Sequence, residues 1–312
     1  MQYRKLGSSD LNVSVIGLGT NNFGNPQRIT DHAASAAVIN QCLDLGINFI
    51  DTADMYGGGQ SEVHIGEALK TRRKEAILAT KFNIAKLEGE SIKARIHRKI
   101  DESLAALQTD YIDLYQIHFP GNEVPQEEML GPMNDLVVAG KVRYVGECNY
   151  SGWRHSQANN VSSKNGWAHM VSSQNYYNLF RRQVELELLP YCTADNVGFL
   201  PYFPLAGGWL TGKYKANDTP GESARRMVGQ LQGDDAARQT LDKLDAYAAE
   251  KGHTILELAF SWLLAHRAVS SVIAGAMTPE QVTANSTAGD WVMTDEERDA
   301  IDAIAAWGGT SE

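Results

Sequence analysis

Residues 76–118, AILATKFNIAKLEGESIKARIHRKIDESLAALQTDYIDLYQIH, contain one complete strand–helix–strand unit. The short apolar runs at 76–81 and 112–118 predict buried strands. Between them, aliphatic side chains recur every three or four residues and so lie along one face of a helix over 91–107. These side chains are Ile92, Ile96, Ile100, Leu104 and Leu107. A unit of this kind is typical of a parallel α/β fold.

The same alternation continues on both sides of this unit. Further apolar runs predict strands at 15–19, 48–51, 142–148, 169–172, 198–202 and 272–274, which makes eight in all. One helix is predicted from a cap at Thr30 or Asp31 to residue 45, and others at 61–69, 126–139, 152–163, 184–195, 236–250, 255–266, 278–284 and 295–306. Before the first strand, residues 3–6 and 11–13 flank the turn Gly7-Ser-Ser-Asp10, which is typical of a hairpin.

Eight β/α units in 312 residues predict an α/β fold, a closed (β/α)8 or TIM barrel, as a single domain over 1–312. The alternative is a doubly wound open sheet, which shows the same alternation of strands and helices. Dinucleotide-binding sheets of that type carry G-x-G-x-x-G after the first strand. Here Gly17-Leu-Gly19 lacks the third glycine, so the sequence favours the barrel.

The overall composition excludes several classes of protein. Twenty-eight lysines and arginines against 38 aspartates and glutamates give a net charge of −10, which disfavours nucleic-acid and anionic-membrane partners. No apolar run approaches the roughly 18 residues that a membrane helix needs, and the N-terminus has no apolar core of a secretory signal. Three widely spaced cysteines, Cys42, Cys148 and Cys192, predict a reducing, cytoplasmic setting.

Two partial motifs are better explained as ordinary structure. The run GGWLTGKY at 207–214 ends in Tyr where a phosphate-binding loop has Ser or Thr. Tyr247 and Lys251 match a dehydrogenase pair, but i, i+4 pairs arise by chance on a surface helix. The histidines are isolated and no C-x-x-C or H-x-x-x-H occurs, so no metal site is predicted.

Four chemically complementary residues fall at or just beyond the ends of neighbouring predicted strands: Asp51, Tyr56, Lys81 and His118. In a barrel these strand ends share the face where such folds place their chemistry. A cation beside a tyrosine lowers its pKa from about 10, and a carboxylate holds that cation. A neutral imidazole orients a carbonyl oxygen, so the set can protonate an oxygen that gains negative charge. Singly, each residue fits a cap, a solvated charge or the core equally well.

Spaced motifs across the chain resemble the aldo-keto reductases, a superfamily of (β/α)8 barrels that use NAD(P)H. They are Asn48-Phe-Ile-Asp-Thr-Ala-Asp-Met-Tyr56, Thr80-Lys-Phe82, Tyr115-Gln-Ile-His118, Pro204-Leu-Ala206, Thr211 to Tyr214 and Gly275 to Asn285, together with an N-terminal β-hairpin plug. The pattern is most similar to bacterial reductases related to the potassium-channel β-subunits. The resemblance implies Tyr56 as general acid or base, Lys81 and Asp51 as its supporting pair, and His118 as the group that orients the carbonyl.

The resemblance also implies a cofactor site. Asn149 and Gln174 would hold the nicotinamide carboxamide, and Tyr202 would stack on that ring. Gly19 and Thr20 would border the nicotinamide ribose, and Asp51 would also belong to the cofactor site. The remaining cofactor residues would be Phe203, Pro204, Leu205, Ala206, Gly207 and Lys213 at the pyrophosphate, and Gly275, Gln281 and Asn285 at the adenosine. Without the resemblance, these positions fit caps, core or solvated charges.

The chain departs from the family pattern at the cofactor site. Cys148 and Phe203 stand where serines are common, so Cys148 would form a weaker side-chain hydrogen bond and Phe203 can donate none to a phosphate. The stretch 275–278 carries no cation for a 2′-phosphate, and Arg225 or Arg226 could supply one instead. We therefore expect NADPH on family grounds, with NADH as the alternative.

The predicted function is NAD(P)H-dependent reduction of a small-molecule aldehyde or ketone. A rim of Asn21, Phe23, Phe82, Phe119 and Trp209 would suit an apolar or sugar-like compound. The first alternative is an alcohol or sugar dehydrogenase of the same fold. The second is a regulatory subunit that binds NADPH without turnover. The sequence leaves the physiological substrate, the preferred direction and the oligomeric state open.

Overall fold

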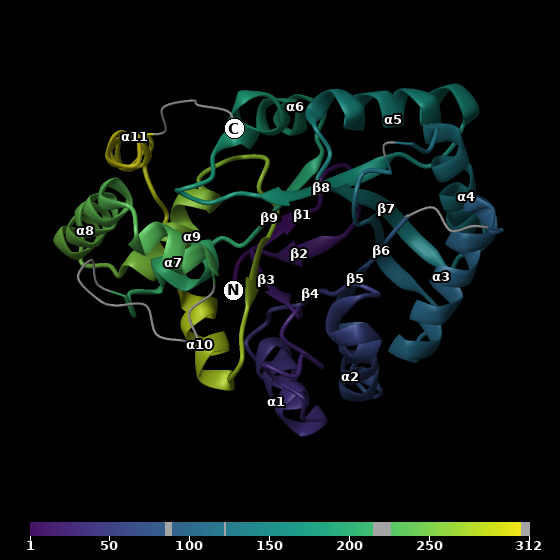
Figure 1. The fold of residues 1–312 in the computed structure, drawn as a ribbon, viewed down its shortest axis with the longest axis horizontal. Helices are drawn as coiled ribbons and strands as arrows, with labels where there is room; N and C mark the ends of the chain where they lie inside the picture. Colours follow the sequence, from purple (N-terminus) through teal and green to yellow (C-terminus); the bar gives the residue numbers. More distant parts are fainter. Residues whose placement is uncertain (85–88, 122, 215–225, 307–312) are drawn as a thin grey trace.

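Eight parallel strands close into a barrel in the computed structural model, which describes residues 1–84, 89–121, 123–214 and 226–306 (Figure 1). The strands are β3 (Ile16–Gly19), β4 (Phe49–Asp51), β5 (Ile77–Phe82), β6 (Ile112–Ile117), β7 (Val142–Cys148), β8 (Met170–Tyr176), β9 (Gly198–Tyr202) and β10 (Val272–Gly275). They pair in sequence order, and β10 closes the ring by pairing with β3 and β9. The predicted (β/α)8 barrel is confirmed.

Helices surround the ring of strands (Figure 1). They are α1 (His32–Asp44), α2 (Gln60–Leu69), α3 (Ile92–Leu107), α4 (Gln126–Val138), α5 (Gly152–Asn165), α6 (Leu188–Ala194), α7 (Arg226–Gln232), α8 (Asp235–Glu250), α9 (Ile255–Leu264), α10 (Pro279–Thr287) and α11 (Asp295–Ile304). Helix α3 begins where the Ser91 side chain accepts a hydrogen bond from the Ala94 N–H, and it buries Ile96 and Ile100 as the spacing predicts. No described helix is both long and apolar enough to cross a membrane.

The predicted N-terminal hairpin consists of β1 (Tyr3–Lys5) and β2 (Asn12–Ser14), paired antiparallel. Beside it, Leu6 and Leu11 are buried in an apolar cluster with side chains from inside the barrel, such as Phe49 and Leu200. In Figure 1 the hairpin lies across the centre of the ring of strands. The hairpin therefore covers one end of the barrel, as a plug.

Three elements differ from the sequence-based expectation. The predicted helix over 184–195 is split into a 3-10 turn (Gln183–Leu186) and α6, because Glu187 has a non-helical backbone and its carboxylate accepts from the Trp153 N–H. Strand β8 continues through a polar run that the apolar pattern missed. Helix α7 was not predicted, since Gly229 in its centre weakens the helical signal.

Candidate active site

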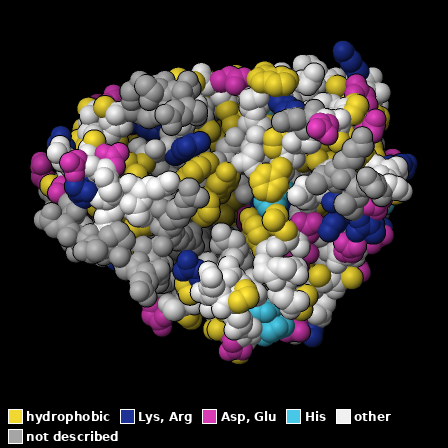
Figure 2. All heavy atoms as spheres, in the orientation of Figure 1, with side chains coloured by type: hydrophobic (Ala, Val, Ile, Leu, Met, Phe, Trp, Pro, Cys, Tyr) yellow, Lys and Arg dark blue, Asp and Glu magenta, His cyan; other side chains and the backbone are white. Residues whose placement is uncertain are grey.

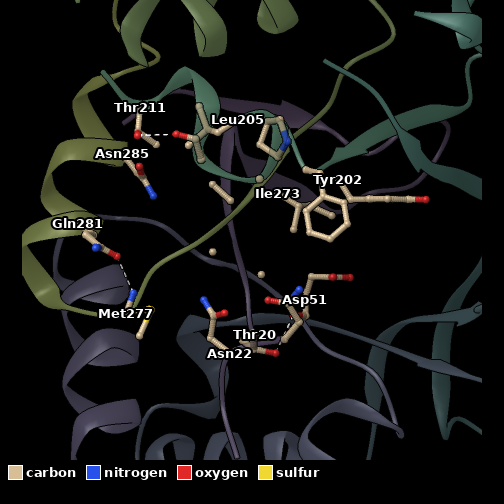
Figure 3. A pocket seen from close by; sticks show the side chains of 18 of the residues that line it. Thr20, Asn22, Asp51, Tyr202, Leu205, Thr211, Ile273, Met277, Gln281 and Asn285 are labelled. Atoms are coloured by element: carbon tan, nitrogen blue, oxygen red, sulfur yellow. Dashed lines mark hydrogen bonds between the residues drawn. The ribbon is translucent and has the colours of Figure 1, made fainter. Parts of the chain in front are cut away.

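A cavity of about 610 Å³ opens where the barrel strands end. Its wall includes the ends of β3, β4 and β10 and the loops that follow β6, β7 and β9. Figure 2 shows its mouth as a hollow bordered by hydrophobic side chains. Figure 3 shows Asp51 and Tyr202 on one side of this space and Gln281 and Asn285 of α10 on the other. The cavity is thus elongated, with a barrel end and an α10 end.

Lys81 and Asp51 form a buried ion pair at the barrel end. The Lys81 Nζ lies 2.7 Å from Asp51 Oδ2 and donates a second hydrogen bond to the Thr52 carbonyl at 2.7 Å. Burial alone would lower the pKa of Lys81, but Asp51, Tyr56 and Cys148 together outweigh this effect, so the pKa is raised. Lys81 is therefore a fixed cation, held by a carboxylate that lines the cavity.

Tyr56 follows β4 and begins a 3-10 turn, Tyr56–Gly59. The next residue, Gly57, has φ +57°, and a Cβ there would lie 2.5 Å from the Phe23 carbonyl oxygen, so only glycine fits. The Tyr56 ring centroid lies 5.0 Å from Lys81 Nζ. Burial raises the pKa of Tyr56, and the Lys81 cation opposes this only in part. The phenol therefore holds its proton at neutral pH.

His118 directly follows β6 and faces Tyr56 edge-on, with ring centroids 5.7 Å apart. Burial, together with the Lys81 charge, lowers the pKa of His118 to about 3. Its buried Nδ1 has no hydrogen-bond partner among the described residues. The ring is thus a neutral imidazole that lines the cavity beside the Tyr56 phenol.

Asn149 and Gln174 line the same part of the cavity, and both amides already have protein partners. Asn149 has φ +64°; its Nδ2 donates to the His118 carbonyl at 2.9 Å, and its Oδ1 accepts from the Tyr202 hydroxyl at 2.8 Å. The Gln174 Nε2 donates to Asp51 Oδ1 at 2.9 Å. Asn149 thus joins the residue after β6 to the end of β9, and Gln174 joins β8 to the ion pair.

A turn with left-handed backbone follows β9 along another wall. Phe203, Ala206, Gly207 and Gly208 all have φ between +47° and +114°. The Lys213 Nζ lies 3.4 Å from where a Cβ on Gly208 would stand, so the ammonium rests over the turn. Ala206 does not line the described cavity, and its side chain is buried in the core. Arg225 lies outside the described residues.

Most of the other residues expected at a cofactor line the cavity as well: Gly19, Thr20, Pro204, Leu205, Gly275, Gln281 and Asn285. At the α10 end, the Gln281 Oε1 accepts from the Met277 N–H at 2.8 Å (Figure 3). The donor set fits an extended dinucleotide: an ammonium over a tight turn suits a pyrophosphate, and amides at both ends suit bases.

Three of the expected rim residues are in the core instead. Phe23, Phe82 and Trp209 are fully buried, and Phe82 stacks on Tyr115 with centroids 4.7 Å apart. Large apolar side chains near strand ends gain more from the strand–helix interface than from an open cavity wall. Asn21 and Phe119 do line the cavity.

Sequence reasoning missed several lining residues: Asn22, Arg28, Thr211, Tyr214, Leu256, Ile273, Met277 and Ala284. The position of Ile273 in a strand and of Ala284 in a helix gave no sign that they face a cavity. Arg28 could have been found, because it is a cation in the loop after the first barrel strand.

Comparisons with known proteins show what the chain as a whole is similar to. A model described as the Aldo/keto reductase family matches residues 15–306. Aldo-keto reductase YhdN of Bacillus subtilis is 34% identical, over 97% of this chain and 93% of that protein. Versiconal hemiacetal acetate reductase of Aspergillus parasiticus is 31% identical, over 85% and 86%. A probable voltage-gated potassium channel subunit beta of Oryza sativa is 32% identical, over 97% and 96%.

Proposed function

The chain belongs to the aldo/keto reductase family, and on this basis we propose that it reduces an aldehyde or ketone with a bound nicotinamide dinucleotide, using Tyr56 as the proton donor. The observation that carries the proposal is the Lys81–Asp51 pair, 2.7 Å apart and buried, with the Tyr56 ring 5.0 Å from the ammonium. The neutral His118 beside Tyr56 supports it further.

The chemistry divides between cofactor and protein. When bound, the reduced nicotinamide supplies a hydride to the carbonyl carbon. The electron pair of the C=O bond moves to oxygen, which takes the Tyr56 hydroxyl proton, and Tyr56 later recovers a proton from water. Lys81 stabilises the phenolate left behind, and Asp51 keeps Lys81 in place. His118 donates a hydrogen bond to the carbonyl oxygen as negative charge develops there.

The expected cofactor is NADPH, with NADH as the alternative. Lys213 and the turn at Gly207 and Gly208 would bind the pyrophosphate that both share. Tyr202, Asn149 and Gln174 would lie against the nicotinamide, and the two amides would have to exchange present partners for the carboxamide. Gln281 and Asn285 would contact the adenosine.

A single-turnover experiment tests the proposal. Protein saturated with NADPH is mixed with 4-nitrobenzaldehyde in a stopped-flow instrument, and the absorbance of the reduced nicotinamide is followed. We expect one equivalent to be consumed and the corresponding alcohol to form. The proposal would be refuted if the protein bound neither NADPH nor NADH.

The similarity to a channel β-subunit favours one further candidate, a regulatory protein that holds NADPH without turnover. Tight NADPH binding with no oxidation by a reactive aldehyde would support that candidate over the reductase. An alcohol or sugar dehydrogenase would be recognised by initial rates in both directions, if alcohol oxidation is faster at physiological cofactor ratios.

A further inference from the structure

One cation of the cavity has no role in the proposal above. Arg28 lies in the loop between β3 and α1, and its side chain lines the cavity. In the described part of the chain, its guanidinium makes no hydrogen bond or ion pair. A partly buried guanidinium that has no partner among the described residues keeps its N–H donors open to a ligand, and it is the group that proteins use to bind phosphate.

The charges that line the cavity also indicate an anionic ligand. Among the described lining residues, the charged side chains are Arg28, Lys213 and Asp51, and Asp51 is already paired with Lys81. Arg28 and Lys213 therefore have no carboxylate partner among the described residues, although the chain as a whole carries a net charge of −10. Such a cavity favours a ligand with more than one anionic group.

The loop that carries Arg28 leads to the α10 end of the cavity. It first packs against the Tyr56 turn at Gly24, and then returns, so that the Ile29 N–H donates to the Asn22 carbonyl at 3.1 Å. The Asn22 amide lies against Gly275, and Figure 3 places Asn22 between Asp51 and Met277.

Helix α1 starts directly after this loop and is joined to α10. The Gln41 Nε2 donates to the Thr283 hydroxyl of α10 at 3.1 Å. Helix α10 in turn supplies Gln281, Ala284 and Asn285 to the cavity, two neutral amides and an alanine. The adenosine end thus has no cation of its own on α10, and Arg28 enters the cavity from the neighbouring loop.

We propose that Arg28 binds the 2′-phosphate of NADPH and so determines a preference for NADPH over NADH. The proposal rests on the proposed function, since it assumes that the cavity holds a nicotinamide dinucleotide. It places the phosphate-binding cation in the loop after β3, not at Arg225 or Arg226. A planar guanidinium can give two parallel hydrogen bonds to one phosphate.

The test is ligand binding by the Arg28→Gln variant, measured by calorimetry with four probes. The probes are NADPH, NADH, 2′,5′-ADP and ordinary 5′-ADP. We expect NADPH and 2′,5′-ADP to bind about 10- to 100-fold more weakly, because a charge-assisted contact is lost. NADH and 5′-ADP should change by less than about twofold, which also shows that the variant is folded. Arg28→Lys should bind NADPH with intermediate affinity.

Arg267→Gln is the matched control, because it removes the same charge from an exposed position before β10, at the other end of the barrel. It should leave all four affinities unchanged. If Arg28→Gln lost NADPH and NADH affinity equally, or lost neither, the proposed role of Arg28 would be overturned. The proposed function would not be affected by that result. A defect confined to the KM of a carboxylated aldehyde such as 4-carboxybenzaldehyde would also overturn that role, because it would assign Arg28 to an anionic substrate. If the unmodified protein binds neither cofactor, the proposed function fails with it.

Discussion

The environment of the Tyr56 hydroxyl combines two opposing effects. Burial favours the neutral phenol and raises its pKa, while Lys81 favours the phenolate and lowers it. Because burial is the larger effect, Tyr56 carries a proton to give at neutral pH, and Lys81 stabilises the anion only when that proton leaves. This order suits a general acid better than a base.

The proposed role of the Tyr56 hydroxyl as proton donor can be tested by removing it. Tyr56→Phe keeps the ring and removes the hydroxyl, so turnover of 4-nitrobenzaldehyde should fall by about 10²- to 10⁴-fold while the NADPH affinity stays within about twofold. Steady-state kinetics and fluorescence titration measure the two quantities. Tyr214→Phe, which removes the same atom from another lining tyrosine, is the control and should keep most activity. Full turnover by Tyr56→Phe would show that another group gives the proton.

At the scale of elements, strand β5 joins the cavity to the outer helices. Successive side chains of a strand point to opposite faces, so Lys81 faces the barrel interior while Thr80 faces α2. There the Thr80 hydroxyl donates to the carboxyl group of Glu62 at 2.6 Å. Burial raises the pKa of Glu62, with a smaller contribution from Asp54, against the opposing effects of Thr80, Ser103 and Lys99.

The burial of Glu62 predicts a pH-dependent stability. Because the pKa of Glu62 is higher in the folded than in the unfolded chain, its contribution is fully favourable below about 4.5 and is lost as the pH rises through the folded value. Glu62→Gln stays neutral throughout. Its free energy of unfolding relative to the parent, from urea titrations, should therefore rise between pH 4 and pH 8. Glu128→Gln, at an exposed position of α4, should show no such trend, and a constant difference for Glu62→Gln would contradict the prediction.

For the molecule as a whole, the sequence predicted the architecture well because β/α periodicity is a local signal. The eight strands, the hairpin and the position of Asp51, Lys81 and His118 at strand ends all follow from it. The residues that form the cavity wall were harder to predict from the sequence. Whether Phe82 packs outward against Tyr115 or faces a ligand depends on barrel closure and strand register, which no local pattern contains. Arg28 was missed for a similar reason, since the path of its loop depends on the approach of Gly24 to Gly57 and on the hydrogen bond from Ile29 back to Asn22.

The two ends of the barrel differ in structure. One end contains the cavity, and the hairpin closes the other end. Gly7, in the hairpin turn, has φ +53°, and a Cβ there would lie 2.4 Å from the Val171 carbonyl oxygen and 2.5 Å from the Gly198 nitrogen. The hairpin turn therefore rests directly on the backbone at the starts of β8 and β9, and any side chain at Gly7 must push it away.

Gly7→Ala should thus destabilise the whole barrel and leave the chemistry intact. We expect a loss of about 2–5 kcal/mol in the free energy of unfolding, the sum of left-handed strain and overpacking. Gly140→Ala separates the two effects, because Gly140 has φ +73° and nothing within 4 Å of a Cβ, so it should lose only about 1–2 kcal/mol. Urea unfolding gives both values. Equal losses would show that the contact beneath the hairpin contributes nothing, and reduced turnover per folded Gly7→Ala molecule would show that the two ends of the barrel are coupled.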